Sequence, residues 1–155
     1  MQDDKTKKKK VSSSSFFFFV ALAIICIALV ELLPSANARL ASAVGLGGFM
    51  ILGGAMHFAP SMMAFYLALM PPFFPFPEFL IYATGVLEAA AGACLFIDRS
   101  LGARLVFATL VIVYPANIWC AVSAEARRKS RIPTMFAYVR LPIQGIFLYW
   151  AYQLF

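Results

Sequence analysis

The chain has 155 residues, of which 63% are hydrophobic and only 13% are charged, with a net charge of +6. A soluble domain is nearer half apolar and a quarter charged, so this composition excludes an ordinary soluble domain and indicates an integral membrane protein embedded in the lipid bilayer. The basic residues lie at the ends of apolar segments rather than along one exposed face, which argues against a nucleic-acid partner and favours a role in membrane topology.

The N-terminal region has the pattern of a secretory signal. Five lysines in the first ten residues precede the apolar stretch 16–33, a helix-breaking Pro34 and an Ala-x-Ala motif that ends at Ala38. This pattern predicts a signal peptide cleaved after Ala38. The alternative is an uncleaved signal-anchor helix, because a mainly apolar stretch of eighteen residues is nearly enough to span a bilayer. We therefore divide the chain into 1–38, the basic tail with its signal peptide or signal anchor, and 39–155, a membrane domain.

Four further apolar segments follow, at 41–58, 79–97, 101–122 and about 136–155. They predict an all-α membrane protein, a four-helix transmembrane bundle preceded by the N-terminal signal peptide or signal-anchor helix. The last helix either starts before Pro142 and bends there, or starts at Pro142 and ends inside the far leaflet, since proline interrupts helical hydrogen bonding.

The distribution of basic residues predicts the orientation of a multi-pass protein. If 16–33 crosses once, the N-terminus shares one side with loops 59–78 and 121–140. That side holds ten basic residues, five in the tail and five in loop 121–140, whereas the opposite side holds three. The positive-inside rule therefore places the basic N-terminus and loop 121–140 in the cytoplasm.

The stretch 59–77 contains no charged residue, and four prolines fall among three aromatic residues near its end. Its first part is too short to span a bilayer, so we expect a short interfacial helix followed by a stiff, extended, proline-rich strap at the headgroup level. Such a segment could roof a lateral cavity, or it could be an inert connector.

Glu88 is the centre of the candidate site, because this carboxylate lies at the midpoint of the apolar run 79–97. An ionisable group at that depth costs at least about 2.5 kcal/mol, so it usually faces the interior of a bundle. Each of the other segments adds a strongly polar side chain, and the helical rise places these groups between the cytoplasmic boundary and the midplane. The predicted polar cluster consists of His57, Glu88, Tyr114, Asn117, Arg140 and Gln144.

This cluster could relay protons, bind a quinone carbonyl or a polar headgroup, or simply hold the helices together by hydrogen bonds. A metal site is not expected, because His57 and Glu88 lie in no H-x-x-x-H or E-x-x-H spacing. About 28 Å of helix rise separates Cys94 from Cys120 in depth, which excludes a disulfide between them. No motif of a conventional catalytic centre occurs, so we assign no catalytic residue.

Five ordered sequence pieces between residue 57 and the end of the chain carry a family resemblance. They are His57-Phe58, Pro71-Pro72 with Pro75 and Pro77, Gly85-Val86-Leu87-Glu88, Tyr114-Pro115-Ala116-Asn117-Ile118, and Arg140-Leu141-Pro142-Ile143-Gln144. In these pieces the chain resembles the DoxX-like family of small integral membrane proteins, which implies a four-helix membrane bundle. That family takes its name from a membrane subunit of an archaeal thiosulfate:quinone oxidoreductase, and a distant branch includes a chaperone for nicotinic acetylcholine receptors.

The cluster and the resemblance together favour a small membrane subunit or anchor of a quinone-linked or other redox complex, without autonomous catalytic activity. Quinone is the candidate cofactor, and a second membrane protein is the expected partner. The alternative is a non-enzymatic membrane chaperone or assembly factor, in which Glu88 only joins helices. A small transporter is a third interpretation, although no inverted repeat or pair of broken helices is visible.

Overall fold

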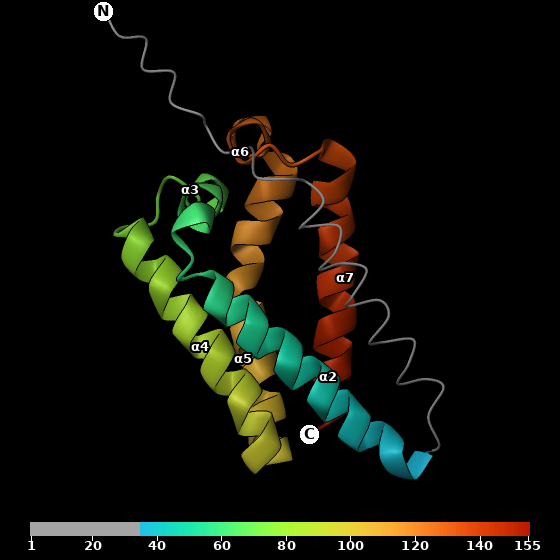
Figure 1. Cartoon of the computed structure of the whole chain (residues 1–155). Helices are drawn as coiled ribbons and strands as arrows, with labels where there is room; N and C mark the ends of the chain where they lie inside the picture. Colours follow the sequence, from blue (N-terminus) through green and yellow to red (C-terminus); the bar gives the residue numbers. More distant parts are fainter. Residues whose placement is uncertain (1–34) are drawn as a thin grey trace, which may run out of the picture.

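The protein is all-helical over residues 35–155, the part of the chain that its computed structural model describes. The basic tail, the apolar stretch 16–33 and the predicted signal peptide or signal anchor therefore lie outside the described residues, apart from the first residues of the first helix. Figure 1 shows the arrangement of the helices. They are α2 (Ser35–Met56), α3 (Pro60–Leu69), α4 (Pro77–Ile97), α5 (Arg99–Val122), α6 (Ala124–Ser130) and α7 (Thr134–Tyr152).

Three of these helices are long and apolar enough to cross a membrane, over Arg39–Met56, Pro77–Ile97 and Arg99–Val122. At about 1.5 Å of rise per residue they are roughly 27 to 36 Å long, which matches a hydrocarbon core of about 30 Å. Many large apolar side chains on their outer faces are exposed, including Val86, Ile97 and Ile112. This surface is compatible with a membrane protein, because lipid rather than water would contact those side chains.

Helices α2 and α4 cross at small residues that permit close backbone approach. A Cβ atom built on Gly92 would lie 2.7 Å from the carbonyl oxygen of Gly47, and one on Gly85 would lie 2.9 Å from that of Gly54. Contacts this short leave no room for a side chain, so glycine is required at these positions. The pairing brings the end of α2 against the middle of α4, where the predicted site residues lie.

The remaining long helices pack in sequence around this pair: α5 packs on α4, and α7 packs on α5 and touches α2. Asp98 joins α4 to α5 and caps α5, since its Oδ1 accepts a hydrogen bond of 3.0 Å from the Leu101 amide. Helix α7 packs along α5 and touches α2, where the rings of Phe49 and Phe147 stack with centroids 4.6 Å apart. Helix α7 begins at Thr134 and continues through Pro142, so of the two alternatives for the last helix the earlier start is correct.

Two short helices lie together at one end of the molecule (Figure 1). Helix α3 confirms the predicted short helix, and it packs mainly against α6. The extended strap was a wrong prediction: residues 70–76 form turns, with a hydrogen bond of 3.2 Å from the Phe74 amide to the Pro71 carbonyl and a left-handed Phe76. The prolines fix φ but do not prevent turns, and the chain must reverse direction here to enter α4.

The predicted loop 121–140 is also more structured than expected. Helix α6 occupies Ala124–Ser130, and α7 takes the residues from Thr134 on. The hydroxyl of Ser123 caps α6 by accepting a hydrogen bond of 3.1 Å from the Ala126 amide. A seven-residue charged helix has no apolar run to reveal it, so the sequence pattern missed it.

Candidate functional site

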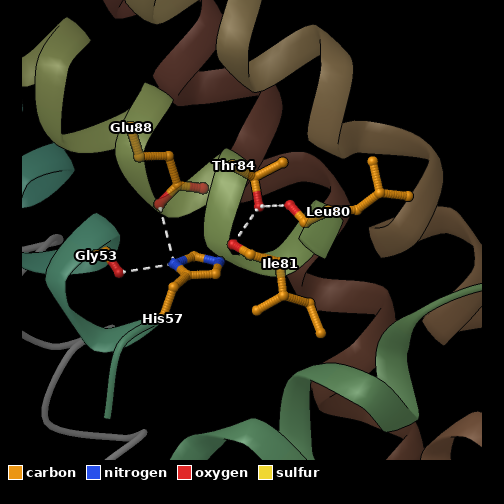
Figure 2. Close-up of polar contacts among 6 residues, drawn as sticks. All are labelled: Gly53, His57, Leu80, Ile81, Thr84 and Glu88. Atoms are coloured by element: carbon orange, nitrogen blue, oxygen red, sulfur yellow. Dashed lines mark hydrogen bonds and ion pairs between the residues drawn. The ribbon is translucent and has the colours of Figure 1, made fainter. Parts of the chain in front are cut away.

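The first half of the candidate site joins α2 to α4. The Nδ1 atom of His57, just after the last turn of α2, lies 3.8 Å from Oε2 of Glu88 and 3.1 Å from the Gly53 carbonyl oxygen. Figure 2 shows the two side chains pointing toward each other from the two helices. Both are largely buried, with 10% of the His57 side chain and 15% of the Glu88 side chain exposed. An acid and an imidazole therefore share one small, mostly apolar space.

Glycine at position 53 makes room for this pair. A Cβ atom on Gly53 would lie 3.3 Å from Glu88 Oε2, a distance tighter than most real Cβ contacts. On the same face of α4, the Thr84 hydroxyl donates to the carbonyl oxygens of Leu80 and Ile81, both at 2.9 Å (Figure 2). Thr84 therefore satisfies its own hydroxyl within α4 and adds little polarity to the space beside Glu88.

Helix α3 contributes a site residue that the sequence did not indicate. The ring of Tyr66 stacks on His57 with centroids 4.1 Å apart and planes inclined by 16°. The stacking fixes the orientation of the imidazole and brings a phenol group to the site. Tyr66 lies in an uncharged stretch of apolar residues, where only its hydroxyl distinguishes it, so no spacing rule could have selected it.

The second half of the site joins α5 to α7. Asn117 Nδ2 donates a hydrogen bond to Gln144 Oε1, and Gln144 Nε2 donates one of 2.6 Å to the Leu110 carbonyl oxygen. Gln144 is 5% exposed, so both the oxygen and the nitrogen of its side-chain amide need these partners. Leu110 lies five residues before Pro115, which is inside α5. Side-chain donors from a neighbouring helix commonly support the backbone around such a proline.

One cavity of about 350 Å³ lies between the two halves. Of the six predicted site residues, five line it and Tyr114 does not. The five are His57, Glu88, Asn117, Arg140 and Gln144. Tyr114 is one turn from Asn117 in sequence, but its half-buried side chain belongs to another part of the α5 surface. The structure thus brings together polar groups from α2, α4, α5 and α7, with Tyr66 added from α3.

The cavity combines polar groups with apolar walls. Its apolar lining includes Phe49, Phe74, Leu110, Ile143 and Phe147. A volume of about 350 Å³ falls within the usual range of small-molecule pockets, which are mostly apolar with a few convergent polar groups. Arginine and tyrosine can donate hydrogen bonds, a carboxylate can accept them, and histidine can do either. The lining therefore suits a molecule with an apolar body and hydrogen-bonding oxygens.

Within residues 35–155, no group of three or more His, Cys, Asp or Glu side chains could hold a metal ion. Cys94 and Cys120 are free thiols, and Cys120 is buried.

The chain belongs to a protein family described as a domain of unknown function, DUF8561, whose model matches residues 46–155. The matched region contains all the cavity residues described above. No curated protein and no solved structure matched the chain.

Proposed function

We propose that the protein is a four-span membrane bundle in which α7 is the fourth crossing helix, beside α2, α4 and α5. With 19 residues, α7 is about 28 Å long, enough to cross a hydrocarbon core of about 30 Å with help from its flanking residues. Arg140 lowers the mean hydropathy of α7, but its side chain lines the cavity instead of the outer surface. A charge in that position is compatible with a crossing helix.

The proposed function of the cavity is to bind the polar head of a quinone or a closely similar lipid-phase molecule. The observation that supports this is the convergence of His57, Glu88, Arg140 and Tyr66 on a cavity with otherwise apolar walls. Tyrosine and arginine suit the two carbonyl oxygens of a quinone ring as hydrogen-bond donors, and the apolar lining suits the ring faces. When bound, a quinone would supply two-electron redox chemistry, and the residues of this chain would bind and orient it.

We further propose that the protein serves as a membrane subunit or anchor of a redox complex, and that it is related to the DoxX-like proteins. The five ordered sequence pieces support the relation, and four of them contribute at least one residue to the cavity: His57, Glu88, Asn117 and the pair Arg140 and Gln144. The proposed role of the lining residues is to bind a ligand, and no catalytic residue is assigned among them.

A membrane chaperone or assembly factor is the second candidate. The turn segment before α4 favours it, because Phe73 is 72% exposed and Phe76 is 78% exposed. Exposed aromatic side chains beside a membrane surface could contact an unassembled client. Affinity purification in mild detergent separates the two functions: a stable redox partner supports the first, and transient binding to unassembled membrane proteins supports the second.

Replacement of Glu88 tests the binding function. In the purified protein reconstituted in lipid nanodiscs, we expect Glu88→Gln to weaken the binding of a radiolabelled short-chain benzoquinone by about ten- to a hundredfold. The reason is indirect, because the Glu88 carboxylate and the quinone oxygens are all acceptors. Glu88 orients His57 and the Arg140 guanidinium, and the loss of a charged interaction of this kind costs about 1.5 to 3 kcal/mol. Glu88→Leu should weaken binding at least as much, because leucine also removes every hydrogen-bonding atom beside the His57 ring.

Glu125→Gln is the matched control, since Glu125 lies on the exposed surface of α6 and pairs with Lys129. This variant should bind the benzoquinone like the parent. The proposed function would be wrong if the parent showed no saturable binding, or if both Glu88 variants bound, accumulated and assembled like the parent.

A further inference from the structure

Helix α6 carries a concentrated positive charge that the cavity does not use. Residues 127–131 contain Arg127, Arg128, Lys129 and Arg131, and Glu125 is the acidic side chain of the same helix. All four cations lie in the short connection from α5 to α7. The arrangement of their side chains shows which of them have partners in the protein.

Two of the four cations are engaged within the structure. Lys129 Nζ lies 2.6 Å from Glu125 Oε1, and its hydrogen bond lowers the pKa of the Glu125 carboxyl, so this pair stays ionised and neutral overall. Arg127 donates to the carbonyl oxygens of Cys120 and Ala121, the last turn of α5. It therefore caps the negative end of that helix dipole.

Among the described residues, neither Arg128 nor Arg131 has a side-chain hydrogen bond or ion pair like those of Arg127 and Lys129, although Arg128 lies close enough to Glu125 to interact with its charge. Both arginines line a shallow hollow between α6 and the start of α7. The hollow is also lined by Arg127, Pro133 and Thr134. Two guanidinium groups and the hydroxyl of Thr134 around one hollow provide the donors that a phosphate group accepts, and guanidinium matches phosphate geometry in two-point hydrogen bonding.

Exposed apolar side chains place this hollow next to the membrane boundary. Val122, the last residue of the candidate span α5, is 63% exposed, and Met135, in the first turn of α7, is 79% exposed. Apolar side chains in these positions would lie in lipid, with the hollow directly beyond them at the level of the headgroups. A soluble anion would need no such apolar border.

The backbone conformation of Arg131 also indicates a functional role for its side chain. Arg131 ends α6 in the left-handed conformation, with φ of 59°. Glycine is favoured at such a position because a Cβ atom is sterically costly there. An arginine in its place suggests a role for the guanidinium group that the helix end alone does not require.

We propose that the α6–α7 hollow binds the phosphate of an anionic phospholipid in the adjacent leaflet, with Arg128 and Arg131 as its ligands. The site fixes the α5–α6–α7 corner to the membrane surface. Because α3 packs on α6, the bound lipid also holds the helix that covers one side of the cavity. The proposal does not depend on quinone binding, since it uses different residues.

The test measures the association of spin-labelled phosphatidylglycerol and of spin-labelled phosphatidylcholine with the full chain in phosphatidylcholine nanodiscs. The parent should prefer phosphatidylglycerol. Arg128→Gln and Arg131→Gln should each lower the affinity for phosphatidylglycerol about fivefold, from roughly 1 kcal/mol per basic residue near a membrane surface, and leave phosphatidylcholine unchanged. Arg131→Gly should lose the same preference while its thermal unfolding temperature stays at or above that of the parent.

The double variant Arg39→Gln with Arg99→Gln is the matched control. It removes two charges near the start of α2 and of α5, at the end of the molecule away from α6. It should leave the preference intact. An equal loss in this control would show a general charge effect and overturn the site. If millimolar inorganic phosphate fully displaced phosphatidylglycerol, the hollow would be a site for free phosphate. If Arg131→Gly bound phosphatidylglycerol like the parent, the Arg131 guanidinium group would not be a ligand. Either result overturns the proposal.

Discussion

At the scale of single residues, glycines determine how closely α2 and α4 approach. A Cβ atom on Gly54 would lie 2.7 Å from the Ala89 amide nitrogen, so the backbones would have to separate to accept it. By contrast, a Cβ atom on Gly48 of the same helix would meet nothing within 4 Å. The two glycines therefore lie on the same helix, but Gly54 packs against α4 whereas Gly48 has open space where a Cβ atom would lie.

Gly54→Ala should therefore destabilise the protein by about 1 to 3 kcal/mol, the usual cost of overpacking. Gly48→Ala should be neutral or stabilise by up to about 1 kcal/mol, because alanine has the higher helix propensity. Unfolding of both purified variants in mixed micelles with increasing denaturing detergent would measure the difference. Equal stabilities would contradict the close packing of α2 on α4.

The individual site residues could be predicted only in part from the sequence. Charged or amide side chains in apolar runs stand out by their desolvation cost, and this criterion selected five residues that line the cavity. Tyr114 was selected because it lies one turn from Asn117, and it does not line the cavity. Tyr66 was missed because its contact with His57 depends on how α3 folds back, which no local pattern encodes.

At the scale of the helices, α4 and α5 diverge from their common turn. Near that turn they pack tightly, since a Cβ atom on Gly102 would lie 2.6 Å from Leu95 Cα. Toward the other end they separate, and α3 lies there (Figure 1). Ile112 of α5 lines the cavity and is also 59% exposed, so its side chain lies where the cavity borders the outer surface. We infer that the cavity opens at this side chain. In a membrane this opening would face lipid.

If the cavity binds a quinone, the opening at Ile112 is its route of entry. Ile112→Trp should then slow the association of a labelled short-chain benzoquinone about tenfold or more by narrowing the opening, with a smaller effect on the equilibrium affinity. Rapid filtration with radiolabelled quinone would measure both quantities in the same preparation.

Ile118→Trp provides the comparison, because Ile118 lies on the same helix with 42% exposure and does not line the cavity. Its association rate should equal that of the parent. Equal rates in Ile112→Trp and in the parent would show that ligands enter elsewhere, for example beneath α3, and would leave the binding site itself unaffected.

Long apolar runs predicted the helices better than any other feature of the sequence. The segments 79–97 and 101–122 each lie within two residues of the observed α4 and α5, because their ends are marked by proline, aspartate and a change to polar residues. Segment 41–58 ends close to the end of α2, whereas its start is set by helical continuity from Ser35 and not by hydropathy. The turns at residues 70–76 depend on the packing of α3 and α4, which composition alone does not determine.

At the scale of the whole molecule, charge is unevenly divided between the two ends of the described helices. The end with α3 and α6 holds Arg127, Arg128, Lys129 and Arg131. The end with the α4–α5 turn and the start of α2 holds Arg39, Arg99 and, nearby, Arg104. Since the positive-inside rule depends on such asymmetry in short connections, we expect the α6 end to face the cytoplasm. The cavity, which α3 covers at that same end, would then be closer to the cytoplasmic surface.

Cysteine labelling tests this orientation directly. In a background where the native cysteines are replaced by serine or alanine, a membrane-impermeant maleimide should label Arg99→Cys in intact cells and Arg128→Cys only after permeabilisation. Both positions are exposed, so a difference in labelling would report the side of the membrane and not burial. The reverse pattern would invert the orientation. It would also move the α6–α7 hollow to the outer leaflet, where anionic phospholipids are scarcer in many membranes, so the orientation decides which lipid the hollow can meet.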